Sequence, residues 1–388
     1  MDFTENDDHQ RLRDGVRALT SRFGDDYWLA RDRDGVYPHE FYDAAAEAGW
    51  FGLTLPQEFG GQALGVMESG AVMHEVARRG GGITAASVLH INLFGPHAIV
   101  VHGSAEQKKR WLPRLATGAD RLCFGFTEPD VGLDATRIKT FARKVDGGYL
   151  VKGQKVWTST AQVANKIMLM TRTTRYEDAA RPTDGMTLFY TDMDRTKIDA
   201  RRLEKMGCIP LDSNSVFIDD LFIPDADRIG EEGKGLRYVM DSLNPERILI
   251  ALECVGIGQD AIDRAAKYAK DRIVFDRPIG QNQGIQHPLA ECWMNLEAAY
   301  LIAWKAAWLF DNGKPCAAEA NTAKLLGSRA GHRAIEQAIY THGGFGYAKE
   351  FHLERMLRDI MMMRLTPVSD QLILSQVAER TLGLPKSY

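Results

Sequence analysis

The segment Leu122-Cys123-Phe124-Gly125-Phe126-Thr127 marks the point where the character of the chain changes. It is a short apolar run that ends in polar residues, and similar short runs occur at 149–151, 166–170, 186–190 and 216–218. Turn-forming residues separate these runs, for example Asp146-Gly147-Gly148. Short strands at this spacing predict a compact β-domain rather than alternating strand–helix units. We expect residues 122–237 to form an antiparallel β-barrel or sandwich.

The residues ahead of this segment, 1–121, carry the pattern of a helical domain. Residues 41–48 are rich in helix formers and place apolar side chains at three- and four-residue spacing. Ser104 is followed three residues later by Gln107, which is the pattern of a capping box. A helix is therefore expected to begin there.

The residues behind it, 238–388, predict a C-terminal four-helix bundle. Asn244 before Pro245 indicates an N-cap and a first helical residue, and apolar side chains follow on one stripe to about residue 271. Further helices are expected at 288–310, 317–341 and 368–382. The predicted fold class is therefore α+β and multidomain: helical 1–121, β 122–237 and helical 238–388.

Length and charge narrow the class of protein. The chain has 388 residues, and roughly 150 residues per domain predict two or three domains. A net charge of −4 argues against a protein that coats nucleic acid or an anionic membrane. No apolar run is long enough to span a bilayer. Five scattered cysteines have no metal-ligand spacing, and residues 1–8 are acidic with no leader pattern. We expect a cytoplasmic protein without metal, nucleic-acid partner or membrane span.

Two features near the β-domain could carry chemistry, and each also has an ordinary explanation. Residues 126–134 run from a strand into a loop with glycine, where N–H groups could face an anion or a ring edge. The alternative is a simple turn. Trp157 stands among hydroxyl residues and could pack on a flat heterocycle, or it could belong to the core.

Two further features lie in the C-terminal region. Glu246 and Arg247 stand at the predicted helix start, where the helix dipole favours a carboxylate for stability alone. His342-Gly343-Gly344-Phe345-Gly346-Tyr347 contains more glycine than a helix cap requires. Either the backbone turns unusually there, or a bulky group passes close to it.

Taken in this order, the features resemble the acyl-CoA dehydrogenase family over essentially the whole chain. Residues 49–61 resemble the family's early GW-GL-P-GG segment, and residues 272–283 resemble its R-x-x-F-G-x-x-I-x-x-x-Q segment. Glu354-Arg355 and Arg358-Asp359 complete the resemblance to its C-terminal signature.

The resemblance implies an FAD bound between the β-domain and the C-terminal helices. The residues implied beside its isoalloxazine ring and the adjoining loop are Phe126, Thr127, Gly132, Trp157 and Ser159. The residues implied to meet the FAD of a neighbouring subunit are Arg272, Phe275, Gln283, Gly343, Gly344, Ser369 and Gln371. It also implies a homo-oligomer, of the tetrameric kind, and substrate contacts from Arg247 and Leu133.

The implied reaction is α,β-dehydrogenation of an acyl-CoA, with an electron-transfer flavoprotein as acceptor. A partly desolvated carboxylate must remove the α-proton. Many members place it just after the RD pair, but counting from Arg358-Asp359 reaches Pro367, which cannot be a base. Isovaleryl- and long-chain-type members instead use a Glu before an Arg, which is Glu246 here. A helix N-terminus would lower its pKa and burial would raise it.

Three departures from the family pattern accompany this assignment. Pro367 lacks the N–H that in the family helps to hold the thioester oxygen. The N–H of Val368, a one-residue shift in the count, or weaker polarisation are the alternatives. Leu133 and Tyr340 replace a frequent Ser and Gln. The functional alternatives are a flavin oxidase or hydroxylase acting on a nitroalkane, amine or carrier-bound acyl group, and a non-catalytic subunit of a heteromeric dehydrogenase.

Overall fold

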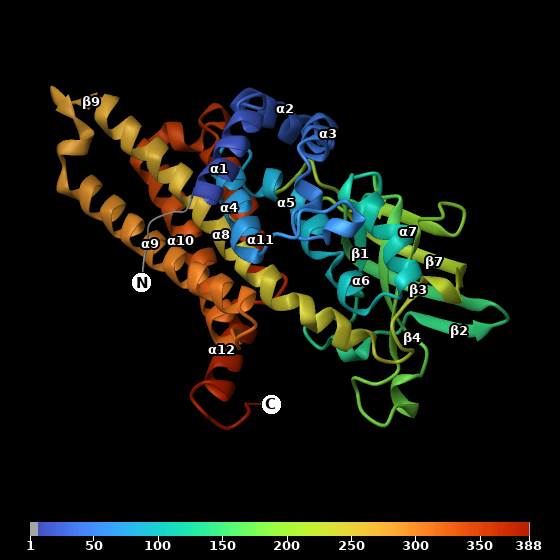
Figure 1. The fold of residues 1–388 in the computed structure, drawn as a ribbon. Coiled ribbons are helices and arrows are strands. Elements are labelled where there is room, and N and C mark those ends of the chain that lie inside the picture. Colours follow the sequence, from blue (N-terminus) through green and yellow to red (C-terminus); the bar gives the residue numbers. More distant parts are fainter. Residues whose placement is uncertain (1–6, 388) are drawn as a thin grey trace.

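The computed structural model describes residues 7–387, so most of the acidic segment 1–8, for which no leader pattern is expected, lies outside the described residues. Its first third is helical, and the helices pack between the β-sheet and the long C-terminal helices (Figure 1). These helices are α1 (Asp7–Thr20), α2 (Asp25–Asp34), α3 (His39–Glu47), α4 (Val66–Ala77), α5 (Gly82–Phe94), α6 (His97–His102) and α7 (Ala105–Ala116).

The expected capping box at the start of α7 is confirmed. Ser104 Oγ accepts a hydrogen bond from the Gln107 backbone N–H at 3.2 Å, and Gln107 Oε1 accepts one from the Ser104 N–H at 2.9 Å. The two bonds satisfy N–H groups that a helix start leaves unpaired.

A single eight-stranded sheet forms the middle of the chain, in the order β6-β7-β3-β2-β4-β5-β8, with β1 beside β4. It is mostly antiparallel, and β1 and β2 pair parallel with β4. The five expected strand segments are confirmed; β2, β6 and β8 are additional. The strands are β1 (Leu122–Gly125), β2 (Phe141–Val145), β3 (Gly148–Ser159), β4 (Lys166–Arg172), β5 (Met186–Asp192), β6 (Ile198–Arg202), β7 (Ser213–Pro224) and β8 (Arg228–Ile229).

Long helices form the last third and extend away from the sheet (Figure 1). They are α8 (Gly235–Asp271), α9 (Gln283–Asp311), α10 (Ala317–His342), α11 (Leu353–Leu365) and α12 (Asp370–Arg380), and α11 was not anticipated. A two-stranded hairpin of β9 (Ile273–Val274) and β10 (Arg277–Pro278) joins α8 to α9 at the far tip. The apolar stripe predicted on α8 is confirmed as buried at Ile248, Leu252, Val255, Ile262, Ala265 and Ala269.

The expected start of the long helix is wrong. α8 begins at Gly235, so Pro245 lies inside the helix and Asn244 is not its N-cap. Proline inside a helix removes one N–H donor and strains the preceding turn, but the helix continues when packing holds it. Glu246 therefore lies in the interior of a helix and not at the dipole's positive end.

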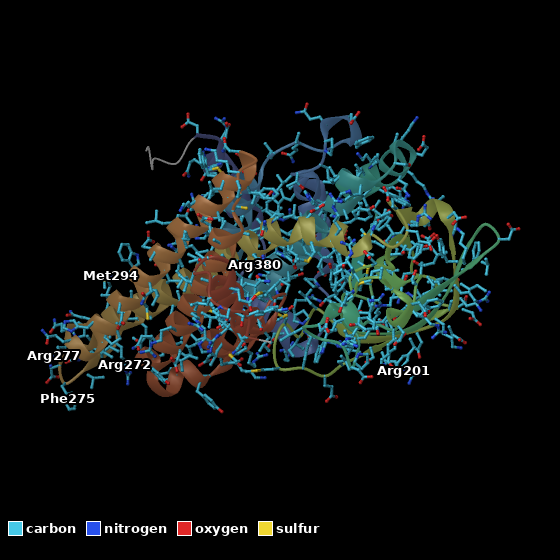
Figure 2. All side chains as sticks on the ribbon, turned by 90° about the horizontal axis from the view of Figure 1, so that it is seen from below. Arg201, Arg272, Phe275, Arg277, Met294 and Arg380 are labelled. Atoms are coloured by element: carbon cyan, nitrogen blue, oxygen red, sulfur yellow. The ribbon has the colours of Figure 1, made fainter. Side chains whose placement is uncertain are left out.

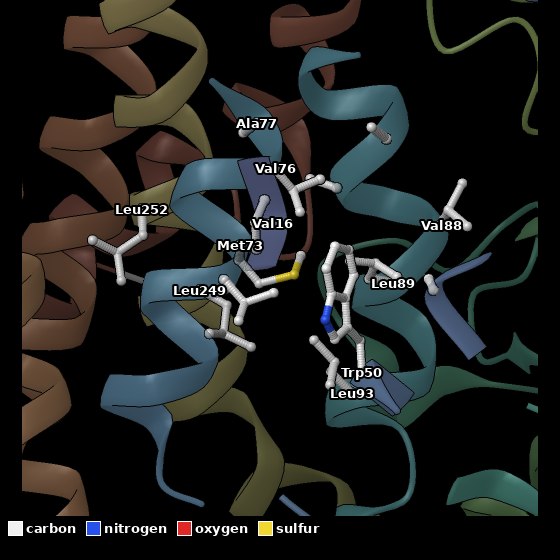
Figure 3. Packing of buried hydrophobic residues seen from close by; sticks show 14 of the residues in the cluster. Val16, Trp50, Met73, Val76, Ala77, Val88, Leu89, Leu93, Leu249 and Leu252 are labelled. Carbon is white, nitrogen blue, oxygen red and sulfur yellow. The ribbon is translucent and has the colours of Figure 1, made fainter. Parts of the chain in front are cut away.

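The largest core joins the N-terminal helices to α8. Figure 3 shows Met73 and Val76 of α4 facing Leu89 of α5 and Trp50, which lies in a short turn of helix ahead of α4, with Leu249 and Leu252 of α8 in the same cluster. One stretch, Gly82–His102, is long and apolar enough to cross a membrane by length and composition, but 72% of its window is buried inside the protein. Burial of this kind is typical of a core helix.

Candidate active site

Glu246 is a carboxylate held inside the protein. Its residue is 9% exposed, and no hydrogen bond to its side chain occurs among residues 7–387. Burial raises the pKa of the Glu246 carboxyl to about 7, against the opposing charges of His90 and Arg247. Because Glu246 lies inside α8, the effect of burial prevails over the helix dipole, which decides the question that the sequence left open.

A pKa near 7 predicts the pH dependence of any reaction in which Glu246 is the base. A base must be ionised to accept a proton, so only the carboxylate form of Glu246 is active. The rate at which the substrate reduces the bound flavin should therefore rise with pH through about 7 and then level off. Stopped-flow rates between pH 5.5 and 9 test this expectation. A profile that is flat across the range, or one that falls as pH rises through 7, would contradict it.

Arg247 is a buried cation with little to neutralise it. The residue is 5% exposed, and its guanidinium donates a long hydrogen bond to Asn244 Oδ1 at 3.4 Å. Its Nε atom is buried and lacks a partner among the described residues. Burial lowers the pKa of the guanidinium, as expected for a charge taken out of water without a partner. Such a group is available to a polar or anionic ligand.

The loop after β1 is anchored by a buried ion pair. Glu128 Oε1 lies 2.9 Å from Lys155 Nζ, and the Lys155 side chain is fully buried. Lys155 Nζ also donates to the Phe126 carbonyl at 3.1 Å, and the Val156 N–H donates to the Thr127 carbonyl at 2.9 Å. The structure therefore brings Phe126 and Thr127 to β3, beside Trp157. Gly132 and Leu133 follow in the same loop and are exposed.

Trp157 is presented on the surface by an irregularity in β3. The register with β7 shifts between Lys155 and Thr158, and Trp157 has a φ of 59°. A positive φ is uncommon for a bulky residue and marks strain that the surrounding structure must hold. Trp157 is 59% exposed. Ser159 ends the strand opposite Ser213 and is half-buried. The exposed indole favours a docking face over a core position.

A second group of predicted residues lies at the opposite end of the molecule. Figure 2 shows Arg272 and Phe275 at the tip of the long helices, far from the sheet. Phe275 is 93% exposed, and Gln283, at the start of α9, is exposed as well. Within one chain these residues do not meet Trp157 or Thr127.

The glycine segment lies near the same tip. Gly343 has φ 60° and ψ −133°, and a Cβ atom at Gly343 or Gly344 would meet nothing within 4 Å. Arg272 stands over the Phe345 ring at 6.0 Å, so the two motifs adjoin. At Gly346 a Cβ would lie 2.5 Å from the Ile339 carbonyl oxygen. Gly346 is thus required by packing within the chain, whereas Gly343 and Gly344 leave open backbone on the surface.

The turn at 366–371 is held to α10 by a buried lysine. Lys324 Nζ donates to the Val368 carbonyl at 2.7 Å, and Ser369 Oγ caps α12 by accepting from the Leu372 N–H. Gln371 is exposed. The charge of Arg247 acts on Lys324, so this turn lies near the Glu246–Arg247 segment. No hydrogen bond from the Val368 N–H occurs in the part of the chain that the structure describes.

His90 and Glu253 are residues that the sequence reasoning missed. His90 Nδ1 and Glu253 Oε1 lie 2.6 Å apart, buried between α5 and α8, and both charges act on Glu246. A sequence signal existed, since each is a lone polar residue in an apolar stretch, Val88–Ile91 for His90 and Ile248–Ile257 for Glu253. Burial of such residues needs a partner, which the sequence could not name.

Comparison with known proteins gives the family. Models of the N-terminal, middle and C-terminal domains of acyl-CoA dehydrogenases match residues 6–119, 123–221 and 233–382. The acyl-CoA dehydrogenase FadE12 of Mycobacterium tuberculosis is 35% identical over 392 residues, covering 100% of this chain and 99% of that protein. The chain belongs to the acyl-CoA dehydrogenase family. Its middle-domain and C-terminal matches include Thr127 and Glu246 respectively.

Other relatives of this acyl-CoA dehydrogenase family member differ in their names. The acryloyl-CoA reductase (NADH) of Anaerotignum propionicum is 34% identical over 331 residues, 84% of this chain and 82% of that protein. The butyryl-CoA dehydrogenase structure from Megasphaera elsdenii has a TM-score of 0.93 at 26% identity and covers 98% of this chain and 100% of its own. A glutaryl-CoA dehydrogenase complex with glutaryl-CoA reaches 0.94 at 28% identity, with 100% and 98% covered.

As a family member the protein is an oxidoreductase that acts on acyl-CoA, and its cofactor is FAD. The described residues fit that group. An exposed Trp157 beside the Thr127 loop offers a flat face, and the Thr158 hydroxyl is buried without a partner. Exposed Arg272 and the bare backbone of Gly343 and Gly344 offer a cation and N–H groups to a pyrophosphate.

Proposed function

We propose that the protein catalyses FAD-dependent α,β-dehydrogenation of an acyl-CoA to the trans-2-enoyl-CoA, with Glu246 as the base. The observation that carries this proposal is the buried carboxylate of Glu246, whose pKa of about 7 suits proton removal near neutral pH. Its family membership supplies the reaction class, and Pro367 at the alternative position leaves Glu246 as the candidate.

Each residue of the candidate site has a distinct role in the proposed dehydrogenation. Glu246 accepts the α-proton, and burial keeps water from competing for its carboxylate. Arg247 would approach the CoA moiety, since its guanidinium forms no ion pair among the described residues and its Nε has no hydrogen-bond partner there. The free N–H of Val368 is our candidate for polarising the thioester carbonyl. FAD, when bound, supplies the acceptor for the β-hydride. Thr127, Trp157 and Ser159 hold its ring, with Phe126, Gly132 and Leu133 in the adjoining loop.

The exposed tip supports an oligomer in which each FAD is held by two subunits. Arg272, Phe275, Gln283, Gly343 and Gly344 are exposed and would contact the FAD of a neighbour, with Ser369 and Gln371 at its adenosine half. Large apolar residues on α9 are also exposed, namely Trp293, Met294, Leu301 and Trp308. We propose a homotetramer in the cytoplasm that passes electrons to an electron-transfer flavoprotein.

A second candidate is the reverse reaction, reduction of an enoyl-CoA. The names of two relatives favour it: the acryloyl-CoA reductase (NADH) and the caffeyl-CoA reductase subunit CarC of Acetobacterium woodii, 32% identical over 329 residues. The same base would then return the proton to the α-carbon, because a catalyst serves both directions. A flavin oxidase is the third candidate, since a prolyl carrier-protein oxidase has a TM-score of 0.90 at 25% identity.

An anaerobic flavin assay tests the proposal. We expect saturated acyl-CoAs of some chain length to bleach the flavin of the purified protein, and a panel of straight and branched acyl-CoAs identifies the preferred substrate. Reduced protein that is reoxidised by enoyl-CoA faster than acyl-CoA reduces it would favour the reductase. Rapid reoxidation by O₂ with peroxide release would favour the oxidase. The proposal fails if no thioester changes the flavin spectrum.

A further inference from the structure

The buried pair His90–Glu253 lies within electrostatic reach of the proposed base, Glu246. His90 Nδ1 and Glu253 Oε1 are 2.6 Å apart, and the two residues are 8% and 0% exposed. Glu253 follows Glu246 by seven residues on α8, about two turns and about 10 Å along the axis. Seven residues bring the two carboxylates onto the same face of the helix, and a Glu253 side chain leans toward the N-terminal end, where Glu246 lies.

Each member of the pair keeps one polar atom unsatisfied. His90 Nε2 and Glu253 Oε2 are buried and have no hydrogen-bond partner among residues 7–387. A buried polar atom without a partner lowers the stability of the fold, so packing alone would favour two apolar residues here. A charge pair retained at that cost calls for a role outside packing.

Aromatic packing also holds the His90 ring, in addition to its ion pair. It contacts the Phe94 ring at 4.7 Å, and Phe94 stacks on Phe124 of β1 at 5.2 Å. β1 continues into the Phe126–Thr127 loop of the proposed flavin site. Aromatic packing and the Nδ1 contact to Glu253 therefore both restrain the imidazole, so the position of its ring is fixed.

The charges that act on Glu246 come from two elements. α5 contributes His90, and α8 contributes Arg247 and Glu253. Burial raises the pKa of Glu246 most. His90 lowers that pKa more than Arg247 does, and the direct effect of Glu253, which raises it, is smaller than either. Burial lowers the pKa of His90, but the charge of Glu253, 2.6 Å from Nδ1, and the charge of Glu246 raise it above its ordinary value. Glu253 thus acts on Glu246 mainly through His90.

We propose that His90 and Glu253 are positioning residues for the base: as a buried ion pair they hold the imidazole at a fixed place within electrostatic reach of the Glu246 carboxylate and so set the pH range in which it works. The inference rests on the proposed function, because it takes Glu246 as the base. It also predicts the order of effects when each charge is removed.

The test is the pH profile of acyl-CoA-driven flavin reduction. His90→Gln removes the positive charge and leaves Glu253, so its apparent pKa should rise by about one unit, which makes the reaction ~10-fold slower at pH 6 with the same plateau at high pH. Glu253→Gln removes its own charge and deprotonates His90, so it should raise the apparent pKa by less. Glu253→Asp keeps both charges and should restore the wild-type profile.

Histidine 97 on α6 provides the matched control. The charges that act on it are Asp241 and His102, not Glu246, so His97→Gln should leave the apparent pKa unchanged. If His90→Gln fails to fold, Glu253→Gln against Glu253→Asp makes the same comparison. Wild-type apparent pKa values in both His90→Gln and Glu253→Gln would overturn the inference. Glu246→Gln with full activity would instead overturn the proposed function, so the two failures are distinguishable.

Discussion

Glu246→Gln should slow acyl-CoA-driven flavin reduction by ~100- to 10,000-fold while the protein keeps its fold and its flavin. The amide has nearly the shape of the carboxyl but cannot accept the α-proton, and loss of a general base costs ~10²–10⁴ in rate. Since burial raises the pKa of the Glu246 carboxyl to about 7, the wild-type side chain is already partly protonated at neutral pH. The substitution should therefore leave the thermal midpoint close to that of the wild type.

The measurement is single-turnover flavin bleaching under anaerobic conditions, at a pH above 8 where Glu246 is ionised. Glu231→Gln, an exposed carboxylate shortly before α8, is the matched control and should react at the wild-type rate. Flavin content by absorbance checks that both variants are loaded. Bleaching of Glu246→Gln at a rate within tenfold of the wild type would place the base elsewhere, and a variant without flavin would point to a structural role.

The three-part fold could be predicted from local patterns. Apolar runs between turns identified strands such as β4 and β5, and the capping box at Ser104 identified the start of α7. The start of α8 was predicted wrongly because Asn244-Pro245 is a good start signal by local rules. Packing carries the helix through Pro245 from Gly235 instead. Local rules describe what a segment prefers, and tertiary packing can override the preference.

The site was predicted only in part, for the same reason. The resemblance selected Glu246 and Trp157, but the partners that give them their properties are distant in sequence. His90 and Glu253 are 163 positions apart, and Lys155 and Glu128 are 27 apart. The positive φ of Trp157 and the burial of Glu246 arise from the folded environment. The spacing of residues along the chain does not predict these long-range contacts.

The ion pair Glu128–Lys155 should have the largest effect on stability. Lys155→Met should lower the free energy of unfolding by about 3–5 kcal/mol, because it leaves the Glu128 carboxylate buried without its cation. Burial lowers the pKa of Lys155 to about 8, and the nearby charge of Glu128 opposes that effect. The same change frees the Phe126 carbonyl that Lys155 anchors, so flavin binding by the Thr127 loop should weaken as well.

Lys152→Met on the same strand is the matched control, because Lys152 pairs with Asp219 on the surface and its loss should leave the thermal midpoint unchanged. Thermal midpoints and bound flavin are measured for both variants. The double variant Glu128→Gln, Lys155→Met should recover part of the loss, since it removes the unpaired carboxylate and its single amide oxygen can still accept from the N–H of one of Lys139 and Thr140, which donate to different Glu128 oxygens in the wild type. Glu128→Gln alone is measured as well. If the double variant loses as much stability as Glu128→Gln and Lys155→Met lose together, the two side chains act independently, and backbone hydrogen bonds alone hold the loop.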